Sequence, residues 1–553
     1  MVQRILILCL SLFVLPIAAA DTPPKAAVAS AHPMATEAGF EVLAAGGNAF
    51  DAAVAVSATL AVVEPYSSGL GGGGFWLLHR ADDGHQVMID GRETAPAAAH
   101  RRMYQDASGE VVPGLSVDGP LAAAIPGEPA ALAHIARTYG RLPLARSLAP
   151  AIRAAREGFA ATEHYRRMAG FRLDALRRSP EAASIFLEDG EVPPLGHVIL
   201  QPDLAKTLRA LAERGAGGFY RGAQARRLVE GVRAAGGVWT AEDLAGYRAL
   251  EREPLVGEYR GRRIVSAPPP SSGGVALLTM LNILSRHDLD AASDWQRAHW
   301  VIEAMRRAYR DRAEYLGDPD FVEVPVERLV HPFYAAGLAV GIRADRATPS
   351  DALAGIGAEP GGPHTSHLSI LDREGNRVAA TLSINYPFGS GFVPPGTGVL
   401  LNDEMDDFSA KPGSPNVYGL VGAEANAIVP GKRPLSSMSP SFVESEERVA
   451  ILGTPGGSRI ITMVLHGVLG VIEGGDAGAV VQRPRYHHQY LPDTVQTEPD
   501  AFPDAVAERL QAMGHRLSTV DPYGNMQVVI WDRGAQRVEA ASDPRGEGRA
   551  AVR

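Results

Sequence analysis

Residues 365–385 alternate polar and apolar side chains twice, on either side of a short polar break. The first alternation runs from Thr365 to Leu371, the break covers 372–376, and the second alternation runs from Arg377 to Asn385. This pattern predicts a β-hairpin. If 372–376 form the loop, Thr365 lies opposite Ser383 and Asn385 shares their face. A slip of one residue would turn every polar side chain to the other face, so this register is favoured.

Two hydroxyls and one amide would therefore meet at the open end of the hairpin. A threonine hydroxyl is a weak nucleophile unless a base lies beside it, and a freed threonine α-amine can be that base. Thr365 is thus a candidate nucleophile. A Ser/Thr-rich surface hairpin remains an alternative on the pattern alone.

Other motifs extend along the chain. After residue 364 these are TSH at 365–367, NDEMDDF at 402–408, PLSSMSP at 434–440 and PGGSR at 455–459. Before it stand GGNAFDAA at 46–53, GLGGGGF at 69–75, DGRETAP at 90–96 and PPPSSGG at 268–274. In this order, from about Ala26 to near the C-terminus, the motifs resemble those of the γ-glutamyltransferases, which are N-terminal-nucleophile hydrolases.

That resemblance implies a self-cleaving proenzyme. Thr365 would attack the carbonyl of His364 and become the N-terminal residue of a new chain. The products would be a large subunit, 21–364, and a small catalytic subunit, 365–553, which stay together as a heterodimer within one intertwined fold.

The resemblance also assigns substrate-binding roles. Arg92 would grip the α-carboxylate of a glutamyl donor, since a guanidinium binds a carboxylate through two parallel hydrogen bonds. Without the resemblance, Arg92 is interpreted as an ion-pair partner of Asp90 and Glu93. The acidic residues of the motif at 402–408 are then interpreted as a solvated loop or a cation site. The implied carboxylate-binding hydroxyls are Ser436 and Ser437, and the implied α-ammonium-binding residues are Asn385, Glu404 and Asp407.

Three further roles follow from the same comparison. Gly456 and Gly457 would form the oxyanion hole, although two glycines after an apolar run also suit a plain turn. Ser383 would keep a hydroxyl beside the nucleophile. The segment 411–433 would be a lid with Tyr418 over the pocket, with an idle surface loop as the alternative.

Composition excludes several classes of protein. A net charge of −10 disfavours a nucleic-acid partner. No run in the body of the chain approaches the roughly 20 apolar residues of a membrane span. Residues 1–20 have a basic start, an apolar run and a small-residue end, typical of a signal peptide. We therefore expect a periplasmic or secreted protein without a stable membrane anchor. Its only cysteine, Cys9, would be lost with that peptide.

No cofactor or metal is expected. The glycines at 69–74 match a dinucleotide fingerprint, but a helical pattern precedes them and a strand-like one follows, which inverts the required order. We predict close backbone packing there instead. The chain has no G-x-S-x-G elbow and no H-E-x-x-H pair, which disfavours an α/β-hydrolase and a zinc hydrolase.

The patterns predict helices over 35–63, broken at 46–48, over much of 121–251 and over 298–316, and paired strands over 75–79 and 86–90. Ala347–Pro363 is expected to be exposed and mobile. Helical patterns gather before residue 364 and strand patterns dominate after it, which suggests an α+β layered fold. The resemblance implies the four-layer αββα sandwich.

The predicted function is that of an exported γ-glutamyltransferase and glutathione hydrolase. It would transfer the γ-glutamyl group of glutathione and related γ-glutamyl compounds to water, amino acids or dipeptides. A glutaryl-cephalosporin-type acylase on the same fold and an inactive binding homologue are the alternatives.

Overall fold

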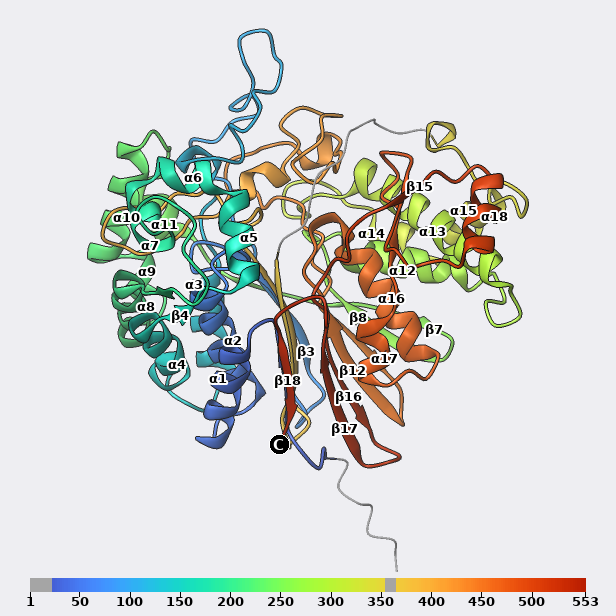
Figure 1. Ribbon diagram of the computed structural model, residues 1–553, viewed down its shortest axis with the longest axis horizontal. Helices are drawn as coiled ribbons and strands as arrows, with labels where there is room; N and C mark the ends of the chain where they lie inside the picture. Colours follow the sequence, from blue (N-terminus) through green and yellow to red (C-terminus); the bar gives the residue numbers. More distant parts are fainter. Residues whose placement is uncertain (1–21, 354–364) are drawn as a thin grey trace, which may run out of the picture.

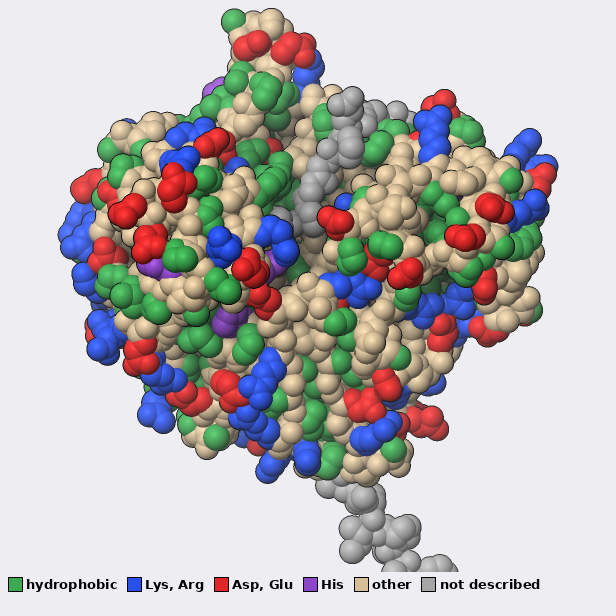
Figure 2. All heavy atoms as spheres, viewed as in Figure 1, with side chains coloured by type: hydrophobic (Ala, Val, Ile, Leu, Met, Phe, Trp, Pro, Cys, Tyr) green, Lys and Arg blue, Asp and Glu red, His purple; other side chains and the backbone are tan. Residues whose placement is uncertain are grey.

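The computed structural model describes residues 22–353 and 365–553. The predicted signal peptide, His364 and most of the segment 347–363 lie outside this range. In the described part, no helix combines the length and apolar character needed to cross a membrane. Figure 2 shows acidic and basic side chains interspersed over the face in view.

Two antiparallel sheets lie face to face at the centre of the molecule (Figure 1). In spatial order the first sheet contains β18 (Arg549–Val552), β1 (Ala27–Ser30), β9 (Ser366–Leu371), β10 (Arg377–Ser383), β2 (Gly73–His79), β3 (Gln86–Gly91) and β6 (Leu250–Arg252). The second contains β17 (Arg537–Ser542), β16 (Gln527–Asp532), β12 (Arg448–Gly453), β11 (Ser441–Glu444), β8 (Arg262–Ser266) and β7 (Leu255–Tyr259). One small sheet contains β13 (Tyr486–His487), β14 (Val495–Thr497) and β15 (Leu517–Thr519). Another contains β4 (Phe159–Ala160) and β5 (Val198–Ile199).

A layer of helices covers the outer face of each large sheet (Figure 1). On the first sheet these are α1 (Pro33–Ala44), α2 (Ala49–Val63), α3 (Glu128–Thr138), α4 (Leu144–Glu157), α5 (Glu163–Phe171), α6 (Leu173–Arg178), α7 (Pro180–Phe186), α8 (Pro202–Arg214), α9 (Gly217–Tyr220), α10 (Gly222–Ala234) and α11 (Ala241–Gly246). On the other side lie α12 (Gly273–Leu284), α13 (Asp294–Tyr315), α14 (Val326–Leu329), α15 (Pro332–Val340), α16 (Ile460–Ile472), α17 (Ala477–Gln482) and α18 (Asp504–Ala512). The expected αββα sandwich is confirmed.

Strand β2 shows why both faces of the first sheet are apolar. Phe75 and Leu77 pack into the core shared by the two sheets, whereas Trp76 and Leu78 pack under the helices α1 to α11. All four side chains are buried, because successive residues of a strand point to opposite faces and both faces here are covered.

The expected separation of helices and strands along the chain is correct only in part, because α1 to α15 precede residue 364 but the strands are divided between the two parts of the chain. The first sheet takes β1, β2, β3 and β6 from before residue 364 and β9, β10 and β18 from after it, while α16, α17 and α18 follow it. Strand β1 pairs with β18 on one side and β9 on the other. The two halves of the chain therefore share one sheet.

The break predicted between the first two helices is confirmed, with α2 beginning after Asn48. The Asn48 Oδ1 accepts the backbone N–H groups of Phe50 and Asp51 at 3.0 and 3.1 Å, and Asp51 returns a bond to the Asn48 N–H. This capping box satisfies amides that the first helical turn leaves free. Helix α2 is buried along its whole length and packs on β9 and β10, so it supports the hairpin.

The glycine-rich turn at 69–74 is packed as predicted. A Cβ on Gly71 would lie 2.0 Å from the carbonyl oxygen of Leu400, and one on Gly72 would lie 2.0 Å from that of Ser383. No side chain fits at these two positions. The turn thus brings β2 directly against the end of β10, where Ser383 stands.

Candidate active site

The hairpin has the predicted register. Leu382 pairs with Ser366 and Arg377 with Leu371, so Thr365, just before β9, lies opposite Ser383, the last residue of β10. Thr365 is only 7% exposed. Its hydroxyl accepts a hydrogen bond from the Gly456 N–H at 2.8 Å.

That donor belongs to a tight turn between β12 and α16. Gly456 has φ 145° and Gly457 has φ 54°, both in the region that favours glycine. A Cβ on Gly457 would lie 2.7 Å from the ring of Tyr418. The backbone conformation and the lack of space both require glycine at 457. Because no side chain covers the turn there, its backbone N–H groups can face a ligand at Thr365.

Arg92, just after β3, is fully buried, and its guanidinium contacts one backbone carbonyl and three carboxylates. Its Nε donates to the Pro434 carbonyl at 3.1 Å, Nη1 to Glu404 at 2.5 Å and Nη2 to Asp407 at 2.5 Å. Glu93 is a weaker contact at 3.4 Å. The only group of Arg92 that donates to Asp90 is its backbone N–H. The other carboxylate oxygen of Asp90 pairs with Arg252. The simple pairing of Arg92 with Asp90 and Glu93 is thus wrong for Asp90.

The residues expected to bind opposite ends of a glutamyl group therefore pair with each other. Burial raises the pKa of Glu404 to about 7, although Arg92 opposes this shift. Burial, followed by repulsion from Glu404, raises the pKa of Glu93 well above its usual range. Burial works against the charge of Arg92, but Glu404, Asp407 and Glu93 outweigh it and raise the pKa of Arg92. The guanidinium stays charged and holds a cluster of carboxyl groups around it.

Asn385 follows β10 with φ 72°, a conformation that asparagine tolerates. Its N–H donates to the Ser383 hydroxyl at 2.7 Å, and its side-chain amide donates to the Asp403 carbonyl at 3.0 Å. Its carbonyl oxygen accepts the Tyr418 hydroxyl at 2.6 Å. Asn385 therefore joins the end of the hairpin to the acidic segment and to Tyr418.

Ser436 and Ser437 lie across the pocket from the hairpin. The Ser436 hydroxyl accepts the Met438 N–H at 3.1 Å, and the Ser437 hydroxyl accepts from Arg312 at 3.2 Å. Arg312 is buried on α13 and also donates to Ser272 at 3.0 Å. The sequence reading missed Arg312, since nothing local to 312 indicates that α13 ends against this serine pair.

One small cavity brings most of the predicted residues together. Its volume is about 20 Å³, little more than the space that one water molecule needs. Gly456 lies beside it, and His364 lies outside the described residues. The predicted residues lining it are Arg92, Thr365, Ser383, Asn385, Glu404, Asp407, Tyr418, Ser436, Ser437 and Gly457.

A second cavity, of about 430 Å³, opens on the other side of Thr365 and includes Gly456 and Glu64. Glu64, directly after α2, accepts the hydroxyl of Ser366 at 2.7 Å. Burial raises the pKa of Glu64 to about 7, while this hydrogen bond opposes the shift. The sequence reading also missed Glu64, which lies 302 residues from its partner. Thr365 thus lines both the small cavity and the larger one.

His299, Glu303 and His515 form the single group of potential metal ligands found within 22–353 and 365–553. Most of their ligand atoms have partners within the protein. Glu303 accepts from Arg307 and Thr348, and His299 contacts His515 and the Arg343 carbonyl at 2.8 Å each. The Nδ1 of His515 is buried without a hydrogen-bond partner among the described residues.

Comparison with known proteins agrees with the geometry. The glutathione hydrolase proenzyme of Escherichia coli K12 is 41% identical over 526 residues, covering 94% of this chain and 90% of the relative. The crystal structure of a cephalosporin acylase from Bacillus halodurans superposes with a TM-score of 0.84 at 30% identity, covering 96% of both chains. That of Helicobacter pylori gamma-glutamyltranspeptidase gives 0.57 at 40% identity, covering 59% of this chain and 94% of that chain. A family model described as gamma-glutamyltranspeptidase matches residues 35–553, and the chain belongs to this family.

Proposed function

We propose that the protein is an exported, self-processing γ-glutamyltransferase and glutathione hydrolase. The observation that carries the proposal is the position of Thr365 between the two cavities, with Arg92 and its carboxylates on one side. The relative named glutathione hydrolase proenzyme supports both the substrate and the processing.

Processing would begin when the Thr365 hydroxyl attacks the carbonyl carbon of His364. The resulting ester is opened by water, which leaves a carboxylate on His364 and a free α-amine on Thr365. The large subunit, 21–364, and the small subunit, 365–553, remain associated through the sheet that they share.

In the processed enzyme, the Thr365 α-amine takes the proton of its own hydroxyl as the oxygen attacks the γ-amide carbon. The Gly456 and Gly457 N–H groups stabilise the tetrahedral oxyanion, and each such donor can contribute about 3 kcal/mol. In the free site the Gly456 N–H binds the Thr365 hydroxyl instead. The amine leaves with a proton, and water or an acceptor amine then resolves the acyl-enzyme.

Donor binding requires the small cavity to open. A volume of about 20 Å³ cannot contain a glutamyl group. The donor α-carboxylate would replace Glu404 and Asp407 on Arg92, with help from Ser436 and Ser437. The freed carboxylates, with Asn385, would bind the α-ammonium, so that one exchange of ion pairs serves both ends of the substrate.

A glutaryl amidase is the second candidate, because the cephalosporin acylase structure covers nearly the whole chain. A glutaryl group has no α-ammonium and gains nothing from Glu404 and Asp407 beside it. The buried acidic pair on Arg92 therefore favours the γ-glutamyl donor.

The deciding experiment compares the hydrolysis of γ-glutamyl-p-nitroanilide and glutaryl-p-nitroanilide by the purified enzyme. We expect kcat/KM to favour the γ-glutamyl compound by about tenfold or more, since it alone offers a cation to the acidic pair. A preference for the glutaryl compound would establish the acylase instead. Turnover of neither, by a chain that remains uncleaved, would indicate an inactive homologue.

A further inference from the structure

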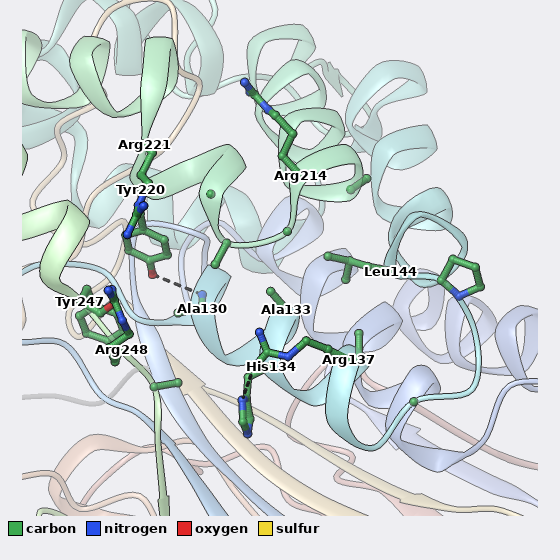
Figure 3. Close-up of a pocket in the computed structure, with 18 of the residues that line it drawn as sticks. Ala130, Ala133, His134, Arg137, Leu144, Arg214, Tyr220, Arg221, Tyr247 and Arg248 are labelled. Carbon is green, nitrogen blue, oxygen red and sulfur yellow. Dashed lines mark hydrogen bonds between the residues drawn. The ribbon is translucent and has the colours of Figure 1, made fainter.

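A wide basic hollow lies apart from both cavities at Thr365, between α3, α9 and the ends of α8 and α11 (Figure 3). Its volume is about 960 Å³. None of its lining residues is acidic, although the chain as a whole has a net charge of −10. We call it the arginine basin, after its basic lining residues His134, Arg137, Arg141, Arg214, Arg221 and Arg248.

Most of these cations have no carboxylate partner. Within the described residues, Arg214 and Arg221 make neither a side-chain hydrogen bond nor an ion pair. Arg248 donates to the carbonyls of Ala245 and Tyr247 at 2.8 and 2.6 Å, and Arg137 to a ring nitrogen of His134 at 3.2 Å. Carbonyl oxygens and a ring nitrogen orient a guanidinium without supplying a carboxylate to balance its charge.

The remaining two basic residues define the border of the basin. Arg141 pairs with Glu374, and His134 pairs with Glu251 at 2.8 Å. Neither carboxylate lines the basin. The positive charge is therefore concentrated inside a concave surface, where it attracts anions more strongly than the same charges would on a flat one.

Two stacked tyrosines form one part of the basin's lining, which we call its floor. The rings of Tyr220 and Tyr247 stack with centroids 5.6 Å apart and planes 8° from parallel. Both side chains are buried, and their hydroxyls donate to the carbonyls of Pro126 and Arg92 at 2.8 and 2.7 Å. A ligand would thus meet aromatic and alanine surface as well as guanidinium groups (Figure 3).

We propose that the arginine basin binds a multivalent anion, with two or more carboxylate or phosphate groups spaced along one chain. Guanidinium groups bind both kinds of oxyanion through paired hydrogen bonds. Several of them around one hollow favour a ligand with several charges over a single ion. The volume lies in the range of ordinary ligand pockets, and the ligand's backbone can rest on the tyrosine floor.

The test is calorimetric titration of the full processed enzyme with tripolyphosphate and, separately, with α-linked hexaglutamate. We expect one equivalent of at least one probe to bind, with affinity that falls as salt rises. Stronger binding of tripolyphosphate would identify phosphate as the preferred group, and stronger binding of hexaglutamate would identify carboxylate.

The double variant Arg214→Gln/Arg221→Gln should weaken that binding by about tenfold or more, because each arginine contributes a charge-assisted contact. The matched control is Arg226→Gln/Arg227→Gln, which removes two exposed arginines from α10 outside the basin. The control should stay within about twofold of the parent protein, and hydrolysis of the γ-glutamyl anilide should be unchanged in both variants.

The proposal is wrong if neither probe binds at a defined stoichiometry. It is also wrong if the control variant loses as much affinity as the basin variant, since binding would then follow overall charge. Both results are independent of whether Thr365 acts on γ-glutamyl amides.

Discussion

At the scale of single residues, Arg92 shows how one side chain can bind several groups of the donor pocket at once. Its three nitrogen atoms reach Pro434, Glu404 and Asp407 in different directions. A lysine ammonium is a compact charge on a flexible chain and cannot reproduce this planar geometry. The charge alone is therefore insufficient for the role proposed here.

We predict that Arg92→Lys raises KM for a γ-glutamyl donor by about ten- to a hundredfold, the loss expected for one charged hydrogen bond. Self-cleavage should continue, because Arg92 takes no part in the attack on residue 364. Steady-state kinetics and a denaturing gel measure the two effects. The matched control is Arg252→Lys, which alters an ion pair to Asp90 outside the pocket. Unchanged donor kinetics in Arg92→Lys would leave Arg92 a purely structural role.

Glu128, the first residue of α3, is a second informative residue. It is fully buried, and neither carboxylate oxygen has a partner among the described residues. Burial raises the pKa of Glu128 to about 8. The folded protein thus keeps a proton that the unfolded chain releases near pH 4.5. Between these two values this group makes the free energy of unfolding fall as pH rises.

We predict that Glu128→Gln removes this pH dependence. The Tm difference between the variant and the parent should shift in favour of the variant as pH rises from 5 to 8. Relative to the variant, the free energy of unfolding of the parent should fall by about 1.4 kcal/mol for each pH unit. Thermal unfolding at several pH values measures it, with Glu213→Gln, an exposed change on α8, as the control. A constant Tm difference across this range would mean that Glu128 does not retain its proton in the folded state.

At the scale of elements, the segment 411–433 is tied to the pocket at several points. The Asn416 amide donates to Asp407 at 3.0 Å, and its oxygen accepts the N–H groups of Tyr418 and Leu420 at 3.0 Å each. Tyr418, Leu420 and Val421 are buried, which does not fit an idle surface loop. A donor ammonium that engages Asp407 would therefore meet the end of the proposed lid.

We predict that deleting 415–422 preserves maturation, admits bulkier donors and shifts the ratio of hydrolysis to transfer. Without Tyr418, bulk water reaches the acyl-enzyme more freely. The ratio is measured with a γ-glutamyl anilide in the presence and absence of a dipeptide acceptor. Tyr418→Phe is the matched smaller change: it loses the hydrogen bond to Asn385 but keeps the ring over Gly457. A deletion that alters neither size preference nor the ratio would show that the segment is no lid.

At the scale of the whole molecule, cleavage before Thr365 would cut a chain whose two parts are interleaved. Strand β1 of the proposed large subunit lies between β18 and β9 of the small one, and β2 pairs with β10. Neither part can bury its own strands without the other. Separation would expose two faces of the central sheet and the edges of its strands.

We predict that the processed protein shows two chains on a denaturing gel but one species in gel filtration and native mass spectrometry. Thr365→Ala should remain a single, inactive chain with the same elution volume, because the attacking oxygen and the later nucleophile are the same atom. Two subunits from this variant, with alanine at the new N-terminus, would refute intramolecular cleavage by Thr365.

The local structure around the nucleophile could be predicted from the residue pattern alone. The alternation on each side of 372–376 specified the hairpin and its register, because every second side chain must face the same core. The run at 69–74 specified a close backbone approach, since only glycine fits at 71 and 72. The family motifs also indicated which residues line the small cavity.

How these residues pair with one another could not be predicted from the residue pattern, because it depends on contacts across the folded molecule. The ion pair between Arg92 and Glu404 spans 312 residues, and the bond between Ser366 and Glu64 spans 302. The interleaved sheet, the contact of Arg312 with Ser437 and the arginine basin likewise join distant segments. The physical reason is that periodicity along a chain reports which face of an element is buried, whereas the partner against which it is buried is selected by the packing of whole layers.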